Sequence, residues 1–198
     1  MLRISNLFKK KKLEDLEKKL PNILVVGMPQ SGSTALFNII TKCLELNNLK
    51  YESYLYGQKK KDRVANKKFL SNYYSENIIL VKEHHYSEFL EQWADTIFLT
   101  KRDIRDSIAS RRRRGKDLFS KGKRQVKEHQ YDENSFFGFK QWCNYLTFDC
   151  FQCWTNVDYV FDYEHYVNNK TEVVKEIINT LNLKKTNFYD ILKYANTG

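Results

Sequence analysis

The chain alternates short apolar runs with longer segments whose apolar positions recur every three or four residues. An unbroken apolar run of strand length, bounded by polar residues, indicates a strand buried on both faces. Three such runs occur, at residues 23–26, 78–81 and 96–99. Residues 50–56 alternate like a strand, and residues 157–161 are expected to form a further one.

Segments with helical periodicity lie between these strands. The clearest are residues 33–46, with leucine, isoleucine and cysteine on one side, and residues 167–181, with a valine and isoleucine face. Further helices are expected at residues 61–74, 87–93, 104–113, 135–155 (rich in aromatic residues) and 187–194. Strands that alternate with helices predict an α/β fold with three α/β/α layers, in which helices cover both faces of a central parallel sheet.

The length of 198 residues fits a single domain, which we place at residues 21–198. The lysine-rich segment 1–20 precedes it and lacks the continuous apolar stretch of a secretory signal. Residues 115–134 are polar and basic without a clear period, so we expect a mobile basic loop there. No run of about 18 apolar residues occurs, so no transmembrane segment is expected.

The formal net charge of +10 indicates anionic partners. Basic residues cluster at 9–12 and 111–127. These clusters fit a clamp for a nucleotide phosphate, a surface for a polyanionic acceptor, a nucleic-acid contact or a solvated loop, and charge alone does not choose between them. We do not expect a nucleic-acid partner, because the stacking aromatic residues of a single-strand binder are not interleaved with the basic ones.

The four cysteines are interpreted as small core residues. Cys43 lies within a helical pattern. Cys150 and Cys153 have the spacing of a redox motif, but no strand-to-helix turn precedes them and a second pair for zinc is missing. Free cysteines fit a reducing compartment, and we therefore expect a cytoplasmic protein.

A glycine loop joins the first strand to the first helix. The nucleotide-hydrolase loop has the form G-x-x-x-x-G-K-[ST], and Gly27, Gly32 and Thr34 hold three of its places, while Ser33 stands where the lysine belongs. Backbone N–H groups, hydroxyl side chains and a helix start can still hold an anion. The missing cation points away from ATP or GTP and toward another anionic nucleotide.

Chemically versatile residues follow the other expected strands. Parallel strands place their carboxyl ends at one edge, where ligands of such folds bind, and the residues there include Glu52, Lys82, His84, Arg102 and Tyr163. A magnesium-dependent phosphoryl transferase needs an acidic residue at a strand end. Lysines end two of the strands and Asp162 is the one weak candidate, so no metal is expected.

Three motifs in order give the chain a family resemblance. Gly-x-Pro-x-Ser-Gly-Ser-Thr, then Lys-x-His after a strand, then Arg-Asp-x-Arg-Asp-x-x-x-Ser resemble the sulfotransferases that use 3′-phosphoadenosine 5′-phosphosulfate (PAPS) as donor. The resemblance covers residues 22–183 and implies the sulfotransferase type of the P-loop-containing nucleotide hydrolase-like fold. It implies that PAPS is bound without a metal.

The resemblance also assigns roles to residues. The loop that holds the phosphosulfate corresponds to Pro29, Gln30, Ser31, Gly32, Ser33 and Thr34. The family's arginine and serine for the 3′-phosphate, eight positions apart, match Arg102 and Ser110, and a Tyr-Glu pair matches Tyr163 and Glu164.

The family's Lys-x-His motif, whose histidine is the general base, matches Lys82 and His84. Histidine is the usual side chain for removing a proton near neutral pH. Some protein-tyrosine sulfotransferases use a glutamate after the first helix instead, and Glu52 is therefore the second choice for the base.

The chain departs from the family at three places. Gln30 replaces the usual lysine or arginine, and Ile104 replaces a proline. The C-terminal basic-glycine motif of cytosolic members is not visible. A neutral amide at residue 30 gives up charge assistance of about 1–2 kcal/mol, or about tenfold in rate, and ~10²–10³ if the cation is a main transition-state stabiliser.

These patterns predict an enzyme that transfers a sulfuryl group from PAPS to a hydroxyl or amine acceptor, for which an acidic glycan is one candidate. Two alternatives stay open. One is a PAPS- or PAP-binding protein with weakened catalysis, and the other is a nucleotide kinase with a degenerate P-loop. The acceptor is not identified, because the aromatic residues of the late helix fit core packing as well as a pocket (Phe136, Phe137, Trp142, Tyr145).

Overall fold

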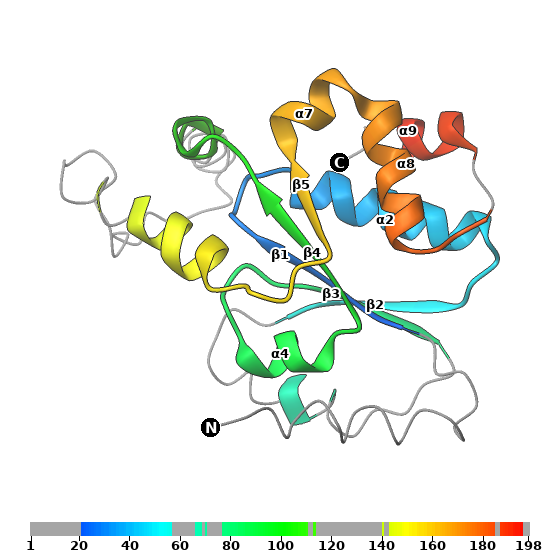
Figure 1. The fold of residues 1–198 in the computed structure, drawn as a ribbon, viewed down its shortest axis with the longest axis horizontal. Helices are drawn as coiled ribbons and strands as arrows, with labels where there is room; N and C mark the ends of the chain where they lie inside the picture. Colours follow the sequence, from blue (N-terminus) through cyan, green and yellow to red (C-terminus); the bar gives the residue numbers. More distant parts are fainter. Residues whose placement is uncertain are drawn as a thin grey trace, which may run out of the picture.

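The computed structural model describes residues 21–56, 66–68, 70, 77–110, 113, 140, 143–184 and 187–195. These residues form a five-stranded sheet in which every pairing is parallel. Its order is β2-β3-β1-β4-β5 (Figure 1). The strands are β1 (Asn22–Gly27), β2 (Tyr51–Leu55), β3 (Ile78–Lys82), β4 (Thr96–Lys101) and β5 (Tyr159–Asp162). The predicted parallel sheet is confirmed.

β1 is the central strand, and all six of its residues are buried. Successive side chains of a strand point to opposite faces. Ile23 and Val25 accordingly pack into one hydrophobic cluster, and Leu24 and Val26 into another. The unbroken apolar run in the sequence is therefore what a strand covered on both faces requires.

Helices cover both faces of the sheet and complete the three layers (Figure 1). One face is covered by α2 (Ser33–Leu46), α8 (Lys170–Thr180) and α9 (Phe188–Ala195), with α7 (Tyr163–Asn168) beside them. The opposite face packs against α4 (Glu88–Trp93) and η1 (Tyr145–Gln152). The predicted helices at 33–46 and 87–93 are confirmed, the latter with Ser87 as its N-cap.

The helix predicted at residues 167–181 corresponds to α8, and only its first two residues belong to a separate helix, α7. α7 begins at Tyr163 because the Asp162 carboxylate accepts the His165 N–H (3.0 Å) and caps the first turn. Asn169 then leaves the helical conformation (φ −133°, ψ 47°), and α8 starts behind it. Residues 168–172 at this break are all polar, and the predicted start of the helix at residue 167 was three residues too early.

The described part of the aromatic-rich helix is a π-helix, η1. Hydrophobic periodicity does not distinguish it from an α-helix over so short a segment. Its Cys150 and the Cys43 of α2 are fully buried, and burial raises the pKa of each thiol to about 12. These two are core residues as predicted, whereas Cys143 and Cys153 are half-buried, and all four are free.

Several predictions concern residues outside the described ranges. They are the segment 1–20, most of the helix at 61–74, the basic loop at 115–134, and the aromatic residues Phe136, Phe137 and Trp142. Within the described ranges, no helix has the length and apolar character needed to cross a membrane.

Candidate anion-binding site at the glycine loop

Two glycines give the loop after β1 its shape. Gly27 has φ 115°, and a Cβ there would lie 2.2 Å from the carbonyl oxygen of Thr100 on β4. Gly32 has φ 82°, and a Cβ there would lie 2.3 Å from the ring of Tyr163. Both positions therefore require glycine for the backbone conformation and for the close neighbour.

The loop between the glycines is held by internal hydrogen bonds. The buried Ser31 hydroxyl donates to the Met28 carbonyl and lies 2.6 Å from the Thr100 hydroxyl. Thr100 in turn donates to the Val26 carbonyl (3.0 Å). The Ser31 hydroxyl, expected from the sequence to face a ligand, thus supports the loop from inside.

The start of α2 provides the anion-binding groups. Its N-cap, Gly32, offers no side-chain cap to the first-turn N–H groups, and the first turn carries no acidic residue. Unsatisfied N–H groups and the helix dipole favour an anion at such an end. Ser33 is buried, Thr34 is exposed, and Pro29 is half-buried at the loop's other side.

β3 brings a cation to this helix start. The Lys82 ammonium donates to the Thr34 hydroxyl at 2.9 Å. In the nucleotide-hydrolase loop the hydroxyl at this place binds Mg²⁺. Here the same oxygen accepts a hydrogen bond from a lysine of the neighbouring strand.

His84 lies two residues past Lys82 and also contacts the loop. Its Nδ1 is 2.9 Å from the Gly27 carbonyl oxygen. A carbonyl only accepts, so Nδ1 carries the proton, and the neutral ring has its basic lone pair on Nε2. The buried Glu83 fixes this turn, because its Oε1 accepts the N–H groups of His84 (2.7 Å) and His85 (2.9 Å).

Arg102 and Ser110 reach the loop from the other side. Arg102 Nη1 donates to the Gln30 carbonyl (3.2 Å), and the Ser110 hydroxyl donates to Gln30 Oε1 (3.4 Å). The guanidinium lies 4.4 Å from the centre of the Tyr163 ring, and its Nε is 3.7 Å from Glu164 Oε1. Among the described residues this buried Nε makes no hydrogen bond, and it is held only by its ion pair with the Glu164 carboxylate.

Glu52 is not brought to the loop. The register pairs it with Ile79, which pairs with Asn22, the first residue of β1. With ~3.3 Å per residue, the two ends of this six-residue strand lie roughly 16 Å apart. The Glu52 carboxylate instead accepts hydrogen bonds from Tyr54 (2.5 Å) and Asn77 (3.0 Å).

A neighbouring ion pair joins the ends of β4 and β5. Lys101 lies 2.9 Å from Asp162, the residue that caps α7. Burial alone would raise the pKa of Asp162, but the His165 N–H and the Lys101 ammonium outweigh it and lower the pKa. Asp162 is therefore a structural carboxylate, and the role of Glu83 and Glu164 as supports was not visible in the sequence.

The strand ends thus assemble the loop, Lys82, His84, Arg102, Ser110 and Tyr163 at one edge of the sheet. Among solved structures, the chain is similar to the mouse sulfotransferase SULT7A1 in complex with PAP, with a TM-score of 0.50 and 14% identity. That alignment covers 91% of this chain and 64% of the mouse protein, so this chain spans less than two thirds of the length of that protein.

A second solved structure, that of APE1195, is similar with a TM-score of 0.47 and 15% identity, over 82% of this chain and 98% of that one. No protein-family profile matches the chain, and no curated protein sequence matches it. The likeness to the mouse protein shows a sulfotransferase-like fold.

Proposed function

We propose that this chain is a sulfotransferase, which transfers a sulfuryl group from PAPS to a hydroxyl or amine acceptor. One observation carries the proposal: β3 delivers a cation and a histidine to the same glycine loop. Lys82 reaches Thr34 and His84 reaches Gly27, each at 2.9 Å. The likeness to a PAP-bound sulfotransferase supports it at the level of the fold.

The residues present fit a donor with two anionic ends. The loop and the first turn of α2 would hold the 5′-phosphosulfate through backbone N–H groups and the Thr34 hydroxyl. Arg102, Ser110 and Tyr163 would hold the 3′-phosphate, since a planar guanidinium is suited to binding phosphate oxygens and Tyr163 supports it from one side. PAPS, when bound, supplies the sulfuryl group and the leaving phosphate.

His84 is the proposed general base. Its Nδ1–H is committed to the Gly27 carbonyl, so Nε2 takes the proton of the acceptor O–H or N–H. As the acceptor atom bonds to sulfur, the sulfur–oxygen bond to the phosphate breaks, and its electron pair stays on the phosphate. The ammonium group of Lys82, which reaches from the end of β3 to the start of α2, stabilises that negative charge.

Lys82 also separates this proposal from the kinase alternative. The hydroxyl that would bind Mg²⁺ in a kinase-like loop accepts from the Lys82 ammonium (2.9 Å). Gln30 adds no charge to the loop, so the cationic stabilisation of the leaving phosphate falls to Lys82. We therefore expect transfer to proceed in the presence of a chelator of divalent cations.

The direct test is transfer of label from ³⁵S-PAPS to a panel of phenols, acidic glycans, peptides and amines. We expect His84→Gln to lower kcat by about 10²–10⁴ while binding of 3′,5′-adenosine bisphosphate is retained. Glu52→Gln serves as the matched control and should keep the wild-type rate. A fully active His84→Gln variant would remove the base from the mechanism.

A nucleotide-binding protein without turnover is the second candidate. The neutral Gln30, whose side chain is held by Ser110 (3.4 Å), favours it. It predicts tight binding of 3′,5′-adenosine bisphosphate, no transfer to any acceptor, and transfer gained in Gln30→Lys. Calorimetry and the same label-transfer assay separate the two candidates.

A further inference from the structure

One residue of the glycine loop, Gln30, is hydrogen-bonded through both its main chain and its side chain by the segment that follows β4. Arg102 donates to the main-chain carbonyl of Gln30 (3.2 Å), and Ser110 donates to its side-chain oxygen (3.4 Å). Arg102 directly follows β4, and Ser110 lies within the helical segment that begins at residue 104. The pair that matches the family's 3′-phosphate residues is thus hydrogen-bonded to the loop at the opposite end of the proposed donor.

Gln30 needs such support because of its backbone. Its φ of 64° is in the left-handed region, which residues with a Cβ adopt at a cost. Such strain persists only where neighbouring groups fix the conformation. The Arg102 hydrogen bond to the Gln30 carbonyl is the contact that fixes this peptide plane from outside the loop.

Arg102 is itself a rigid support. Its side chain is 16% exposed, its guanidinium stacks on Tyr163 (4.4 Å), and its Nε lies 3.7 Å from Glu164. Tyr163 in turn lies against Gly32, where a Cβ would come within 2.3 Å of the ring. A planar fork can stack and donate at the same time, which a lysine ammonium at this position cannot do.

We propose that Arg102 is a positioning residue of the glycine loop. Through the Gln30 carbonyl it fixes the orientation of the loop's donors, so the residue assigned to the 3′-phosphate also determines how well the loop binds an anion at its own end. The inference rests on the proposed function for the identity of the ligand. It deepens that function, because the two ends of the donor are then recognised by coupled rather than independent sites.

The decisive probe is a nucleotide that lacks the 3′-phosphate. Calorimetry is carried out with adenosine 5′-monophosphate (AMP) and with 3′,5′-adenosine bisphosphate. We expect Arg102→Lys to weaken both, with AMP affinity lower by about threefold to tenfold. The control is Arg105→Lys, a change at an 85% exposed arginine that pairs with Asp103, and it should alter neither affinity. If Arg102→Lys weakens only the bisphosphate, Arg102 reads the 3′-phosphate alone and the proposal is overturned.

A second arm uses the strain at Gln30. Glycine adopts the left-handed conformation without strain, so in a Gln30→Gly background the effect of Arg102→Lys on AMP affinity should shrink to roughly half or less, the sign of an energetic coupling between the two positions. An undiminished loss in that background means that Arg102 acts on AMP by another route, and it overturns the proposal.

Thermal unfolding without ligand tests the positioning role of Arg102 independently of which ligand the protein binds. Arg102→Lys should lower Tm by about 2–4 °C, and the loss should be smaller in the Gln30→Gly background. If the wild-type protein binds neither nucleotide, the proposed function is contradicted. If, in the same protein, Arg102→Lys lowers Tm less in the Gln30→Gly background than in the wild-type background, the positioning role is still supported. Equal losses of Tm in both backgrounds overturn the positioning role, whatever the protein binds.

Discussion

At the scale of single residues, the loop after β1 contains three residues in backbone conformations that few residues with a side chain adopt. Gly27, Gln30 and Gly32 all have positive φ (115°, 64° and 82°). Each is held by a neighbour from another strand end: Gly27 by Thr100, Gly32 by Tyr163, and Gln30 by Arg102. The loop is therefore shaped before any ligand arrives, which is the condition for a binding site that loses little entropy on binding.

Gly32→Ala tests this packing. The new Cβ would enter the space of the Tyr163 ring (2.3 Å) at a backbone with φ 82°. We expect a loss of unfolding free energy of about 2–4 kcal/mol, the sum of backbone strain and overpacking, and weaker binding of 3′,5′-adenosine bisphosphate. Chemical denaturation and calorimetry measure the two effects.

The matched control is Asn48→Ala, an exposed position with φ 55°. It carries the left-handed strain without the packing against Tyr163, so it should cost about 1 kcal/mol and leave nucleotide binding unchanged. Equal losses at the two positions would mean that the Tyr163 contact contributes nothing.

Most candidate site residues could be found from the sequence because strand ends are visible in the apolar pattern. Lys82, His84 and Arg102 each follow a buried run directly, and parallel strands bring such positions together. Glu52 was misplaced because it is the second residue of β2, at the amino end of that strand rather than past its carboxyl end. The supporting role of Glu83 was missed, and Glu164 was matched only as part of the Tyr-Glu pair, because a carboxylate's backbone partners depend on turns that only the fold defines.

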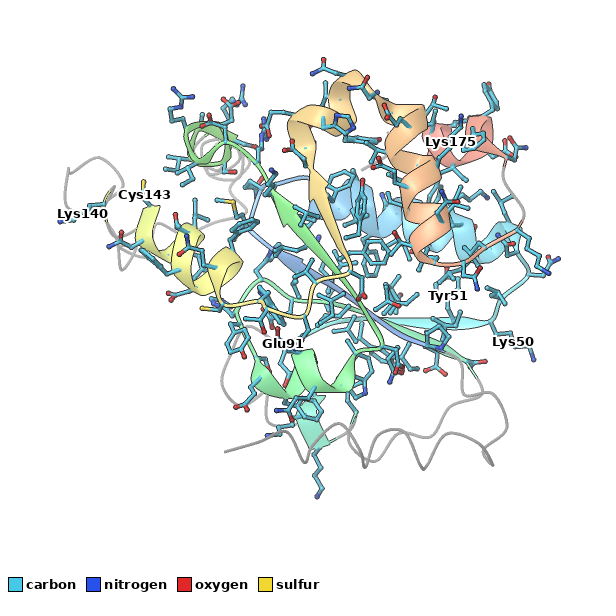
Figure 2. All side chains as sticks on the ribbon, in the orientation of Figure 1. Lys50, Tyr51, Glu91, Lys140, Cys143 and Lys175 are labelled. Atoms are coloured by element: carbon cyan, nitrogen blue, oxygen red, sulfur yellow. The ribbon has the colours of Figure 1, made fainter. Side chains whose placement is uncertain are left out.

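At the scale of elements, α4 is tied to the end of η1 by a single buried carboxylate. Glu91, labelled on α4 in Figure 2, accepts from Tyr86 (2.9 Å) and from the Thr155 N–H (2.6 Å), its hydroxyl (3.1 Å) and the Asn156 N–H (3.0 Å). Burial alone would raise the pKa of Glu91, but these hydrogen bonds outweigh it and lower the pKa. The ionised carboxylate is therefore the form that joins the two elements.

Glu91→Gln should cost about 1–3 kcal/mol of unfolding free energy near neutral pH, because the amide nitrogen no longer accepts from Tyr86 and the neutral amide oxygen is a weaker acceptor for the Thr155 and Asn156 donors. Since the folded pKa lies below the unfolded value, this stability is present above about pH 4 and is lost as the pH falls through the folded pKa. Denaturation of wild-type and variant protein at a series of pH values measures the difference, which should narrow on acidification.

Glu88→Gln on the same helix is the control for this prediction. Glu88 is exposed and accepts from Gln92 (3.1 Å), so its replacement should change stability little at any pH. A gap between wild-type and Glu91→Gln protein that stays constant with pH would contradict the assignment of the ionised form.

Element types were easier to predict from the sequence than element ends. Long periodic segments such as Ser33–Leu46 were predicted with the correct bounds. The break between α7 and α8 was missed because it depends on the Asp162 cap and on the backbone conformation of Asn169, neither of which the apolar pattern reveals. η1 was predicted as a helix, but its π geometry follows from packing and not from the spacing of its apolar residues.

At the scale of the whole molecule, the fold gathers the candidate site residues at one edge of the sheet, whereas the excess of positive charge belongs to the chain as a whole. The chain carries a net charge of +10, and both Lys82 and Arg102 face the proposed donor site. A positive field raises the affinity for anions and is screened by salt. The positive sign of this field could be predicted from the sequence, whereas the positions of Lys82 and Arg102 at the proposed donor site follow from the order of the strands in the sheet.

Binding of 3′,5′-adenosine bisphosphate should therefore weaken with ionic strength. Between about 0.01 M and about 0.15 M salt the Debye length falls from roughly 30 Å to roughly 8 Å, and we expect affinity to fall by about tenfold, as measured by calorimetry. Lys82→Gln should flatten this dependence. Lys42→Gln removes the same charge from a surface pair with Glu45 and should leave the slope nearly unchanged, and identical slopes for both variants would contradict the role of Lys82.

The central place of β1 also has a consequence for how the chain is made. β1 is synthesised first, yet its partners begin only at Ile78 and Thr96. Ribosomes add about 5–20 residues per second, so this largely apolar strand waits unpaired for roughly 3 to 11 s before its first partner, β3, emerges. During biosynthesis, the strand that later carries the binding loop is thus exposed until β3 has been made, and exposed apolar strands are prone to aggregation.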